Sequence, residues 1–351
     1  MKHVLLLGAG HAHAWLLAAL AEEPLHGARL TLVSPYPRQI YSAMLPGVIA
    51  GHYSREEAEF DVVALAEGAF TEFIPGTVAK LDVARRVAIL SDGRELAYDT
   101  ASLNVGSRTD DTTPGARERA LSVKPFERLL EQRLPSEPHI AIAGGGAGGV
   151  ELAMALRHRG AEVTLYSERS NFAPELERRI ERALRRRRVD FRPGMRVDAL
   201  EEGPVVVAGR SRQHFDIVLW ATGAVPLNWL GRTGLATDER GFLRVDATLR
   251  SVSHPDVFAV GDCAALDEPK SGVHAVRHGR ALAHNLRALI AGTPLASYER
   301  SPHALWLISC GGRYAIAARG GSSAEGRWAW WWKNWIDRRW MARLRGPKKR
   351  G

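Results

Sequence analysis

Two stretches of the chain, far apart in sequence, follow the same plan. VLLLGAGHAHA from Val4 and IAIAGGGAGGVELAMAL from Ile140 each give an apolar strand, a glycine-rich turn and the start of a helix. A second strand follows in each, over residues 28–33 and 162–166, and ends in serine. Each stretch closes on an aromatic-Asp pair before a buried strand that ends in glycine, over 98–106 and 215–223. This duplication predicts two doubly wound α/β units, each with a ligand site at the carboxyl ends of its parallel strands.

The chain after residue 223 has to complete this arrangement. A strand over 257–260 enters Gly261-Asp262, and a helical stretch covers about 273–291, so we expect the chain to return to the first unit. A final hairpin, over 304–310 and 313–319, is joined by Gly311-Gly312. We therefore predict two Rossmann-like dinucleotide-binding domains, the second inserted in the first. The predicted bounds are 1–107 and 223–296 for the first domain, 108–222 for the second, and 297–351 for a C-terminal hairpin and amphipathic tail.

The second glycine-rich turn has the spacing of a nucleotide fingerprint in the right context. Gly144 permits the tight turn, Gly146 lets the backbone approach a pyrophosphate, and Gly149 lets helix and strand pack closely. The alternative is a merely tight strand-to-helix turn. Ser167 ends the following strand where an acidic residue usually binds the ribose, and Glu168 and Arg169 come next. A carboxylate favours NADH and an arginine favours NADPH, so the sequence does not decide which of the two nucleotides binds.

The first turn is less regular. Gly8 and Gly10 are in place, but His13 takes the third glycine position, so either the helix sits further from the strand or the ring points away. Ser34 again replaces the acidic strand end. Asp262, placed between a buried strand and a helix, could accept hydrogen bonds from a polyol such as the ribityl chain of a flavin, or could cap the helix.

Charge and cysteine content narrow the classes of function. The net charge is +9, and residues 327–350 hold nine basic residues and one acidic, so most of this charge belongs to the tail. The arginine run ERRIERALRRRR is interleaved with glutamates, which favours a solvated helix over nucleic-acid binding. His11 and His13 lack a further ligand cluster, so we expect no metal site and prefer a structural or flavin-neighbouring role for them. The only cysteines, Cys263 and Cys310, form neither a disulfide framework nor a C-x-x-C motif.

Taken together, the chain resembles the two-dinucleotide-binding flavoproteins, which include type II NADH dehydrogenases and pyridine nucleotide-disulfide oxidoreductases. Over nearly its whole length it is most similar to the flavoprotein found fused N-terminally to selenide, water dikinase. The motifs that carry this resemblance are GHAHAWLL, YSAMLPGVIAGHYS, LNVGS, VKPFE, GGGAGGVELA, FAVGDCA and GRWAWWWKNWIDRRWMARL. The resemblance implies bound FAD with NADH or NADPH as co-substrate.

Site residues follow from that resemblance. The FAD site would comprise Gly8, Gly10, His11, Ser34, Arg38, Met44, Pro46, Val78, Gly106, Gly261, Asp262 and Ala275. The NAD(P)H site would comprise Gly144, Gly146, Gly149, Ser167, Arg169, Thr222 and Gly223. Glu151 matches a glutamate that type II enzymes keep between nicotinamide, flavin and quinone. His278 stands where those enzymes have a glutamine, and we predict both Glu151 and His278 to be catalytic.

The missing cysteines set the expected chemistry. Disulfide reductases carry a cysteine pair in the first helix, whereas this chain has no cysteine before Cys263, so dithiol relay chemistry is excluded. Sulfide:quinone oxidoreductases also use cysteines at the flavin, which argues against that activity. What remains is an FAD-dependent NAD(P)H dehydrogenase that passes electrons directly to an acceptor, for which a quinone fits. The alternative is an accessory, redox-responsive flavoprotein serving a partner in a selenium or sulfur pathway.

The C-terminal tail predicts where the protein works. Six of the ten tryptophans lie between Trp328 and Trp340, and on a helix four of them share one face with Ile336. Indoles beside basic residues suit an anionic lipid surface, although they could instead pack on the body or on a partner chain. We expect residues 327–351 to attach the protein peripherally to the cytoplasmic face of the inner membrane. A homodimer is left open.

Overall fold

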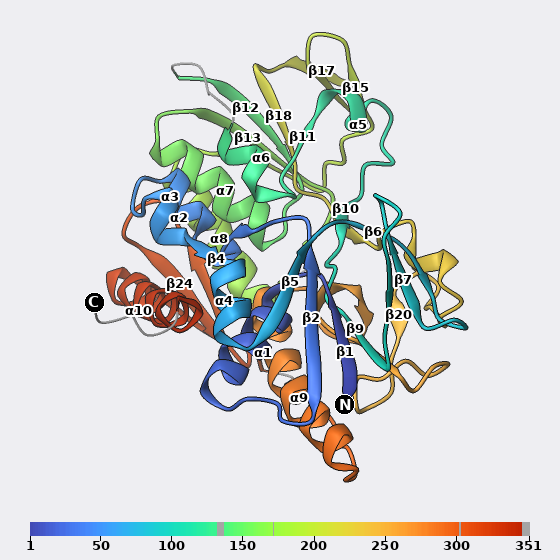
Figure 1. The fold of residues 1–351 in the computed structure, drawn as a ribbon. Helices are drawn as coiled ribbons and strands as arrows, with labels where there is room; N and C mark the ends of the chain where they lie inside the picture. The colour runs from blue at the N-terminus through green and yellow to red at the C-terminus, as the bar shows by residue number, and fades with distance from the viewer. Residues whose placement is uncertain (132–136, 171, 302, 346–351) are drawn as a thin grey trace.

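The computed structural model describes residues 1–131, 137–170, 172–301 and 303–345. Two five-stranded parallel sheets organise this part of the chain (Figure 1). The first has the order β21-β9-β1-β2-β5 and the second the order β11-β18-β12-β13-β14. The first sheet consists of β1 (Lys2–Leu7), β2 (Ala28–Ser34), β5 (Thr71–Pro75), β9 (Thr100–Leu103) and β21 (Val257–Ala259). The second consists of β11 (Leu121–Ser122), β12 (His139–Ala143), β13 (Glu162–Ser167), β14 (Asp190–Pro193) and β18 (Ile217–Trp220).

The two sheets repeat one topology, which confirms the predicted fold class of two Rossmann-like units. In the first, β1 lies between β2 and β9, with Val4 opposite Leu30 and Thr100. In the second, β12 lies between β13 and β18, with Ile140 opposite Val163 and Ile217. Only the outer strand differs in origin. The chain that returns from the second unit supplies β21, whereas β11 belongs to the second unit itself and precedes β12.

Helices follow the glycine-rich turns in both units. In the first, α1 (His11–Glu22) packs against α9 (Gly272–Ala291) and α4 (Val62–Gly68), and in the second α7 (Ala147–His158) packs against β13. Helix α1 begins at His11, directly after Gly10 of the glycine-rich turn. Helix α8 (Pro174–Arg186) buries Leu176 and Ile180 and pairs Glu175 with Arg178 and Arg179. The arginine run therefore forms an amphipathic helix with Glu–Arg pairs on its surface, as predicted, and the absence of nucleic-acid binding stays a prediction.

Smaller elements surround the two sheets. Three-stranded antiparallel sheets are formed by β6 (Val78–Asp82), β7 (Val87–Leu90) and β8 (Glu95–Ala97), and by β15 (Ala199–Glu201), β16 (Val205–Ala208) and β17 (Ser211–His214). Between β2 and β5 lie β3 (Arg38–Ile40), η1 (Ser42–Met44), α2 (Leu45–Ile49), α3 (Arg55–Ala58) and β4 (Glu59–Asp61). The units are joined by β10 (Arg108–Thr109) and β19 (Ala224–Val225), and the short helices α5 (Ala116–Arg119) and α6 (Phe126–Glu131) follow β10 in the chain. The returning chain adds η2 (Leu230–Arg232), β20 (Leu243–Arg244), η3 (Gly261–Cys263) and β22 (Ala264–Ala265).

The C-terminal region forms a three-stranded antiparallel sheet and a long helix. Strands β23 (Trp306–Ser309) and β24 (Ala315–Arg319) form the predicted hairpin, and an unpredicted third strand, β25 (Ser322–Gly326), follows. The predicted Gly311-Gly312 turn is wrong in detail, because only Gly311 has a positive φ and the loop spans five residues. The tight two-residue turn with two positive φ angles is instead Gly320-Gly321, between β24 and β25.

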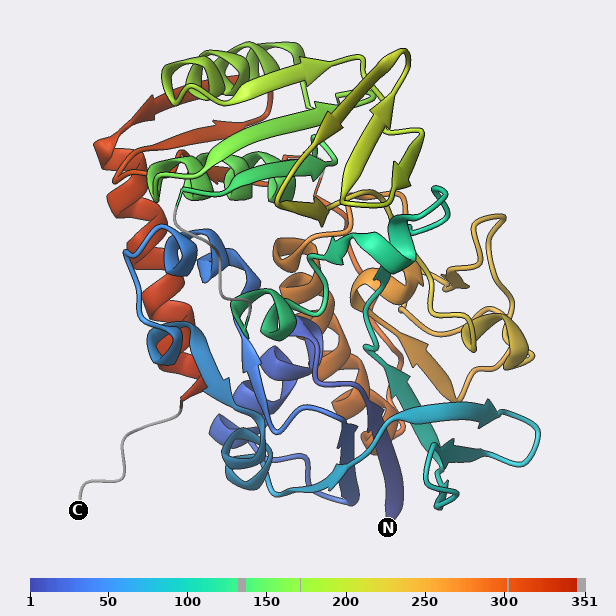
Figure 2. The same cartoon turned by 90° about the horizontal axis from the view of Figure 1, so that it is seen from above.

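Helix α10 (Arg327–Leu344) runs along one side of the molecule, where it contacts the C-terminal sheet and, through α1 and β4, the first unit (Figure 2). Its inner face buries Ala329, Trp330, Met341 and Leu344, and the last two join the core of the first unit. Its outer face exposes Trp328, Trp331, Trp332 and Trp335, with exposed fractions of 52%, 50%, 40% and 58%. The predicted grouping of these four tryptophans is therefore present, and each keeps a large exposed surface.

Candidate functional site at the carboxyl ends of the two sheets

The first glycine-rich turn is organised around Asn104, at the end of β9. Its side-chain oxygen accepts hydrogen bonds from the backbone N–H groups of Ala12 and His13, each at 3.1 Å, in the first turn of α1. Its side-chain nitrogen donates to the Val260 carbonyl at 3.0 Å. Asn104 therefore ties the N-terminus of α1 to both β9 and the end of β21. We did not single it out from the sequence, although the LNVGS motif contains it.

Three glycines are required by this asparagine. A Cβ atom at Gly8, Gly10 or Gly261 would lie 2.5, 2.6 or 2.3 Å from an Asn104 atom. Gly8 and Gly261 also have positive φ angles, of 86° and 68°. The turn therefore depends on glycine mainly for close packing around Asn104.

His13 occupies the place of the third glycine and resolves the alternative left open by the sequence. Its ring is fully buried between α1 and β9, with Nδ1 2.6 Å from the Gly8 carbonyl and Nε2 2.8 Å from Ser102 Oγ. Burial lowers the pKa of His13 to about 4, so the ring is neutral and donates from Nδ1 to Gly8 while accepting from Ser102. The ring thus points toward the sheet. Among the described residues, no group of three His, Cys, Asp or Glu side chains could hold a metal ion.

Asp262 follows β21 and lies at the same edge of the first sheet. Its Oδ2 accepts hydrogen bonds from Ser107 Oγ at 2.9 Å and Lys124 Nζ at 3.0 Å. Burial opposes its ionisation, but Lys124 and Ser107 together keep the pKa of Asp262 below its ordinary value. This gives a carboxylate that can accept hydroxyl hydrogen bonds. The sequence did not identify Lys124, which comes from the VKPFE motif.

The other predicted FAD residues separate into two groups. His11 lies partly buried between α1, η1 and the start of α9, with Nε2 3.3 Å from Ser42 Oγ, and burial lowers its pKa to about 4. Ala275 of α9 lines a small cavity with Gly261 and Asp262, which places it at the site. Gly106 has open space where a Cβ would lie. The remaining residues stay predictions: Met44, Pro46 and Val78 are buried, Arg38 pairs with Glu59 at 3.7 Å, and Ser34 Oγ accepts the Tyr36 N–H in a local turn.

The second glycine-rich turn has the geometry expected of a pyrophosphate site. A Cβ at Gly144 would lie 2.3 Å from the Ala221 carbonyl oxygen, and one at Gly149 would lie 1.9 Å from that of Gly144, so both positions pack too closely for a side chain. Gly146, by contrast, has nothing within 4 Å of the place of its Cβ. The N-terminus of α7 therefore faces open space, where backbone N–H groups can receive phosphate oxygens.

The ends of the strands in the second unit complete this site. Ser167 ends β13 as Ser34 ends β2, and its hydroxyl donates to the Arg169 carbonyl in the same kind of local turn. Glu168 and Arg169 are both exposed beside it. Their opposite charges leave the choice between NADH and NADPH open, as it was from the sequence.

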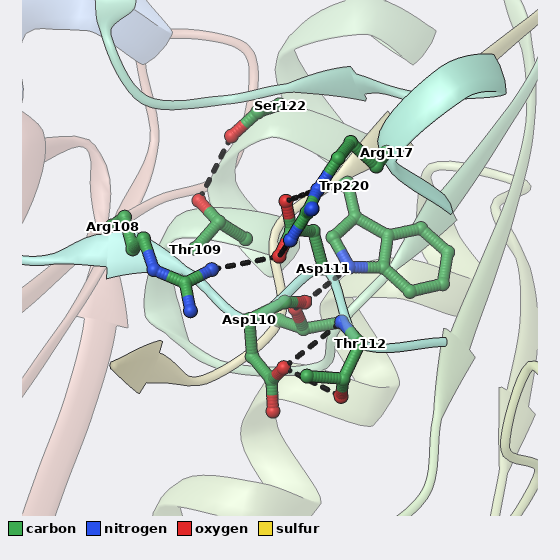
Figure 3. Close-up of polar contacts among 9 residues, drawn as sticks. Arg108, Thr109, Asp110, Asp111, Thr112, Arg117, Ser122 and Trp220 are labelled. Carbon is green, nitrogen blue, oxygen red and sulfur yellow. Dashed lines mark hydrogen bonds and ion pairs between the residues drawn. The ribbon is translucent and has the colours of Figure 1, made fainter. Parts of the chain in front are cut away.

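Asp110 and Trp220 lie at the connection between the two units (Figure 3). Strands β10 and β19 pair antiparallel and carry the chain into and out of the second unit. The Asp110 carbonyl accepts hydrogen bonds from both Thr222 Oγ1 at 2.7 Å and Trp220 Nε1 at 2.6 Å. Asp111 pairs with Arg108 and Arg117, which lower its pKa to about 2. The Thr222 hydroxyl therefore fixes this connection, whereas the adjacent Gly223 carries no side chain.

Glu151, from the first turns of α7, lies in a buried polar cluster. Its Oε1 accepts the Ser309 N–H from β23 at 2.7 Å. Burial raises the pKa of Glu151 to about 7, against the opposing effect of the nearby Lys333. Lys333 and Asp337 of α10 are themselves buried, pair at 2.7 Å, and Lys333 also donates to the Ala43 carbonyl. A carboxyl group that exchanges its proton near neutral pH is thus held where both units and α10 meet.

His278, also predicted to be catalytic, is fully occupied by protein contacts. Its Nδ1 accepts the Gly261 N–H at 2.9 Å, and its Nε2 donates to Glu268 Oε1 at 2.5 Å. A catalytic role for His278 stays a prediction, and these contacts favour a positioning role.

Both cysteines are buried and free. Burial raises the thiol pKa of Cys263 to about 11 and that of Cys310 to about 12. Neither is therefore a thiolate at neutral pH, which supports the expectation that no thiol takes part in the chemistry.

The sequence family described as pyridine nucleotide-disulphide oxidoreductase matches residues 2–279. The chain belongs to this family. Ferroptosis suppressor protein 1 of Xenopus laevis is 28% identical over 264 residues, which cover 69% of each chain. An NADH dehydrogenase-like protein of Bacillus subtilis (strain 168) is 23% identical over 288 residues, covering 77% of this chain and 79% of that protein. The sulfide:quinone oxidoreductase of Aquifex aeolicus shares the fold, with a TM-score of 0.84 at 17% identity and coverage of 98% and 92%.

Membership in the pyridine nucleotide-disulphide oxidoreductases makes the chain an FAD-dependent NAD(P)H oxidoreductase. The residues fit these two cofactors: the first unit offers a buried carboxylate at Asp262 beside open space at Gly106, and the second an open glycine turn at Gly146. The member described here departs from the family name because it lacks a redox-active cysteine pair. The narrower resemblance, to the flavoprotein that is found fused to selenide, water dikinase, stays a prediction.

Proposed function

We propose that this protein is an NAD(P)H:quinone oxidoreductase that works while attached to a membrane surface. Its reaction would be NAD(P)H plus a proton plus quinone, giving NAD(P)⁺ and quinol. Bound FAD would supply the hydride acceptor and return two electrons to the quinone. The observation that carries the proposal is the buried Glu151, whose pKa is about 7, beside the Lys333–Asp337 pair of a helix with four exposed tryptophans.

The acceptor is argued from the protons that the reaction needs. A quinone takes up two protons with two electrons, whereas one-electron carriers need none from the enzyme. Glu151 can hold a proton near neutral pH and release it, because burial brings its pKa to about 7. Lys333 stays charged through its contact with Asp337, since that carboxylate and Glu151 oppose the effect of burial on the lysine pKa. Glu151 and the neighbouring Lys333 thus form a group that can hold protons.

A direct transfer is favoured because the chain offers no thiol for a relay. Cys263 and Cys310 are buried, and their raised thiol pKa values disfavour thiolate formation. In the direct transfer that we propose, NAD(P)H binds at the turn of Gly144, Gly146 and Gly149. FAD binds at the turn of Gly8 and Gly10, with Asp262.

The membrane part of the proposal rests on the outer face of α10. Trp328, Trp331, Trp332 and Trp335 are exposed together, and Arg313 and Arg339 lie over Trp331 and Trp335 at 6.0 and 5.6 Å. Amphipathic indoles flanked by arginines suit the headgroup region of an anionic leaflet, where each basic residue contributes about 1 kcal/mol at low salt. No helix in the described part of the chain is long and apolar enough to span a bilayer. We propose peripheral attachment at the cytoplasmic face.

Vesicle binding tests this attachment. The variant with Trp328, Trp331, Trp332 and Trp335 replaced by serine should no longer sediment with anionic vesicles, yet should keep its FAD. Phe70→Ser is the matched control, because Phe70 is 76% exposed on another part of the surface. Undiminished sedimentation of the tryptophan variant would refute membrane attachment through α10 and leave the reaction itself untouched.

A further inference from the structure

The buried cluster around Glu268 has no part in the proposed reaction. Glu268 lies in the loop between β22 and α9, and its side chain is only 6% exposed. It accepts hydrogen bonds from His278 Nε2 at 2.5 Å and from Tyr298 Oη at 3.1 and 3.2 Å. His274 Nε2 lies 3.9 Å from its other oxygen. Within the ranges that the structure describes, neither Lys nor Arg forms an ion pair with Glu268.

These contacts fix the protonation states in the cluster. His278 Nδ1 accepts the Gly261 N–H, so this nitrogen carries no proton, and the single ring proton is on Nε2 facing Glu268. Burial opposes ionisation of Glu268, but the bonds from His278 and Tyr298 and the nearby His274 hold its pKa below the ordinary value. Burial also lowers the pKa of His274, which leaves that ring neutral. Glu268 is therefore an ionised carboxylate, and Arg277 lies near Tyr298 and His274 at the edge of the cluster.

The cluster acts on the FAD side of the site through two routes. His278 holds the N–H of Gly261, next to Asp262, whose carboxylate bonds Ser107 and Lys124. Glu268 lies beside the first turn of α9, because His274 and Ser271 belong to that turn and its cap. A helix N-terminus stabilises negative charge, and a buried carboxylate next to it reduces that effect.

We infer that His278 and Glu268 are positioning residues for FAD: His278 holds the Gly261-Asp262 turn in its binding geometry, and Glu268 keeps the reduction potential of bound FAD low. This inference depends on FAD as the cofactor and on no particular acceptor. The inference can therefore be refuted while the proposed quinone reductase activity stands. Likewise, a failure of quinone reduction would not refute the inference.

Two substitutions at His278 test the positioning role by FAD affinity. His278→Leu leaves the Gly261 N–H buried without an acceptor, so the dissociation constant of FAD should rise about tenfold. His278→Gln should bring it back to within about threefold of wild type, because the glutamine oxygen can accept from Gly261 while its nitrogen donates to Glu268. His284→Gln, at an exposed position on the same helix, is the matched control. Wild-type affinity in His278→Leu, or no rescue in His278→Gln, would overturn this role.

The charge of Glu268 is tested by the potential of bound FAD. Glu268→Gln keeps an acceptor for His278 and Tyr298 but removes the charge. It should shift the equilibrium toward reduced FAD by about tenfold, or about 30 mV for a two-electron couple, with FAD affinity little changed. Asp267→Asn is the control, because Asp267 is 99% exposed and its charge is screened. An unchanged potential in Glu268→Gln would overturn the electrostatic role of Glu268. If His278→Leu does not fold, the potential of Glu268→Gln and the FAD affinity of His278→Gln test the two roles instead.

Discussion

Replacing Glu151 with glutamine should make the stability of the FAD-loaded protein less dependent on pH. The folded-state pKa of Glu151 is about 7, above its ordinary value of 4.5. Below pH 4.5 Glu151 is protonated in both the folded and the unfolded protein, so it does not reduce the free energy of unfolding. As the pH rises from 4.5 to 7, only the unfolded protein ionises Glu151, and the free energy of unfolding falls. Well above pH 7 it falls no further. This difference in pKa corresponds to about 3 kcal/mol in the free energy of unfolding. Glutamine keeps the shape but does not titrate.

Urea unfolding of both proteins at pH 5 and pH 8 gives the comparison. We compare the free energy of unfolding of Glu151→Gln with that of wild type at each pH. This difference should favour the variant by about 2 to 3 kcal/mol more at pH 8 than at pH 5. Glu162→Gln, at an exposed position in the same unit, should show no such pH dependence. The variant should also lose the step near pH 7 from the pH profile of acceptor reduction. An equal stability difference at both pH values would refute the assignment of a buried, proton-exchanging Glu151.

Three further predictions concern groups around the site. Lys333→Met should lower the free energy of unfolding by about 3 to 5 kcal/mol because it leaves Asp337 buried without its partner, and adding Asp337→Leu should restore most of that loss in urea titrations. Asn104→Ala removes three buried hydrogen bonds, so about 3 kcal/mol of stability and part of the bound FAD should be lost, as thermal unfolding and flavin absorbance would show. The double variant Cys263→Ser with Cys310→Ser should keep its rate of flavin reduction by NAD(P)H, since neither thiol is ionised at neutral pH; a large drop in stopped-flow measurements would contradict the direct transfer.

The fold was predictable because its main signals are local. Apolar strands, glycine turns and helix starts recur in both units, and this repetition also indicated that residues 257–260 return to the first sheet. The turn in the C-terminal sheet was misplaced because two glycine pairs compete there, and only strand pairing shows that Gly320-Gly321 forms the tight turn. The strand β25 carries small polar residues with no alternation, so its sequence gives no strand signal.

The site was harder to predict because its partners lie far apart in sequence. Asp262 was identifiable from its place after a strand, but its partner Lys124 comes from another unit, 138 residues away. Glu268 looked like an ordinary loop acid, and only the fold brings it to His278 and Tyr298. On α10 the tryptophan face followed from helical spacing. The burial of Lys333 on the opposite face was not predictable, because a lysine is rarely buried unless it is paired, here with Asp337.

The most direct test of the account is rapid anaerobic mixing of the FAD-loaded protein with NADH or NADPH, followed by a soluble quinone. At least one nucleotide should bleach the flavin absorbance within seconds, and the quinone should restore it without added thiol. Bleaching without reoxidation by quinone would contradict the proposed acceptor and favour the alternative of a flavoprotein that serves a partner. A flavin that neither nucleotide reduces would contradict the dehydrogenase assignment itself.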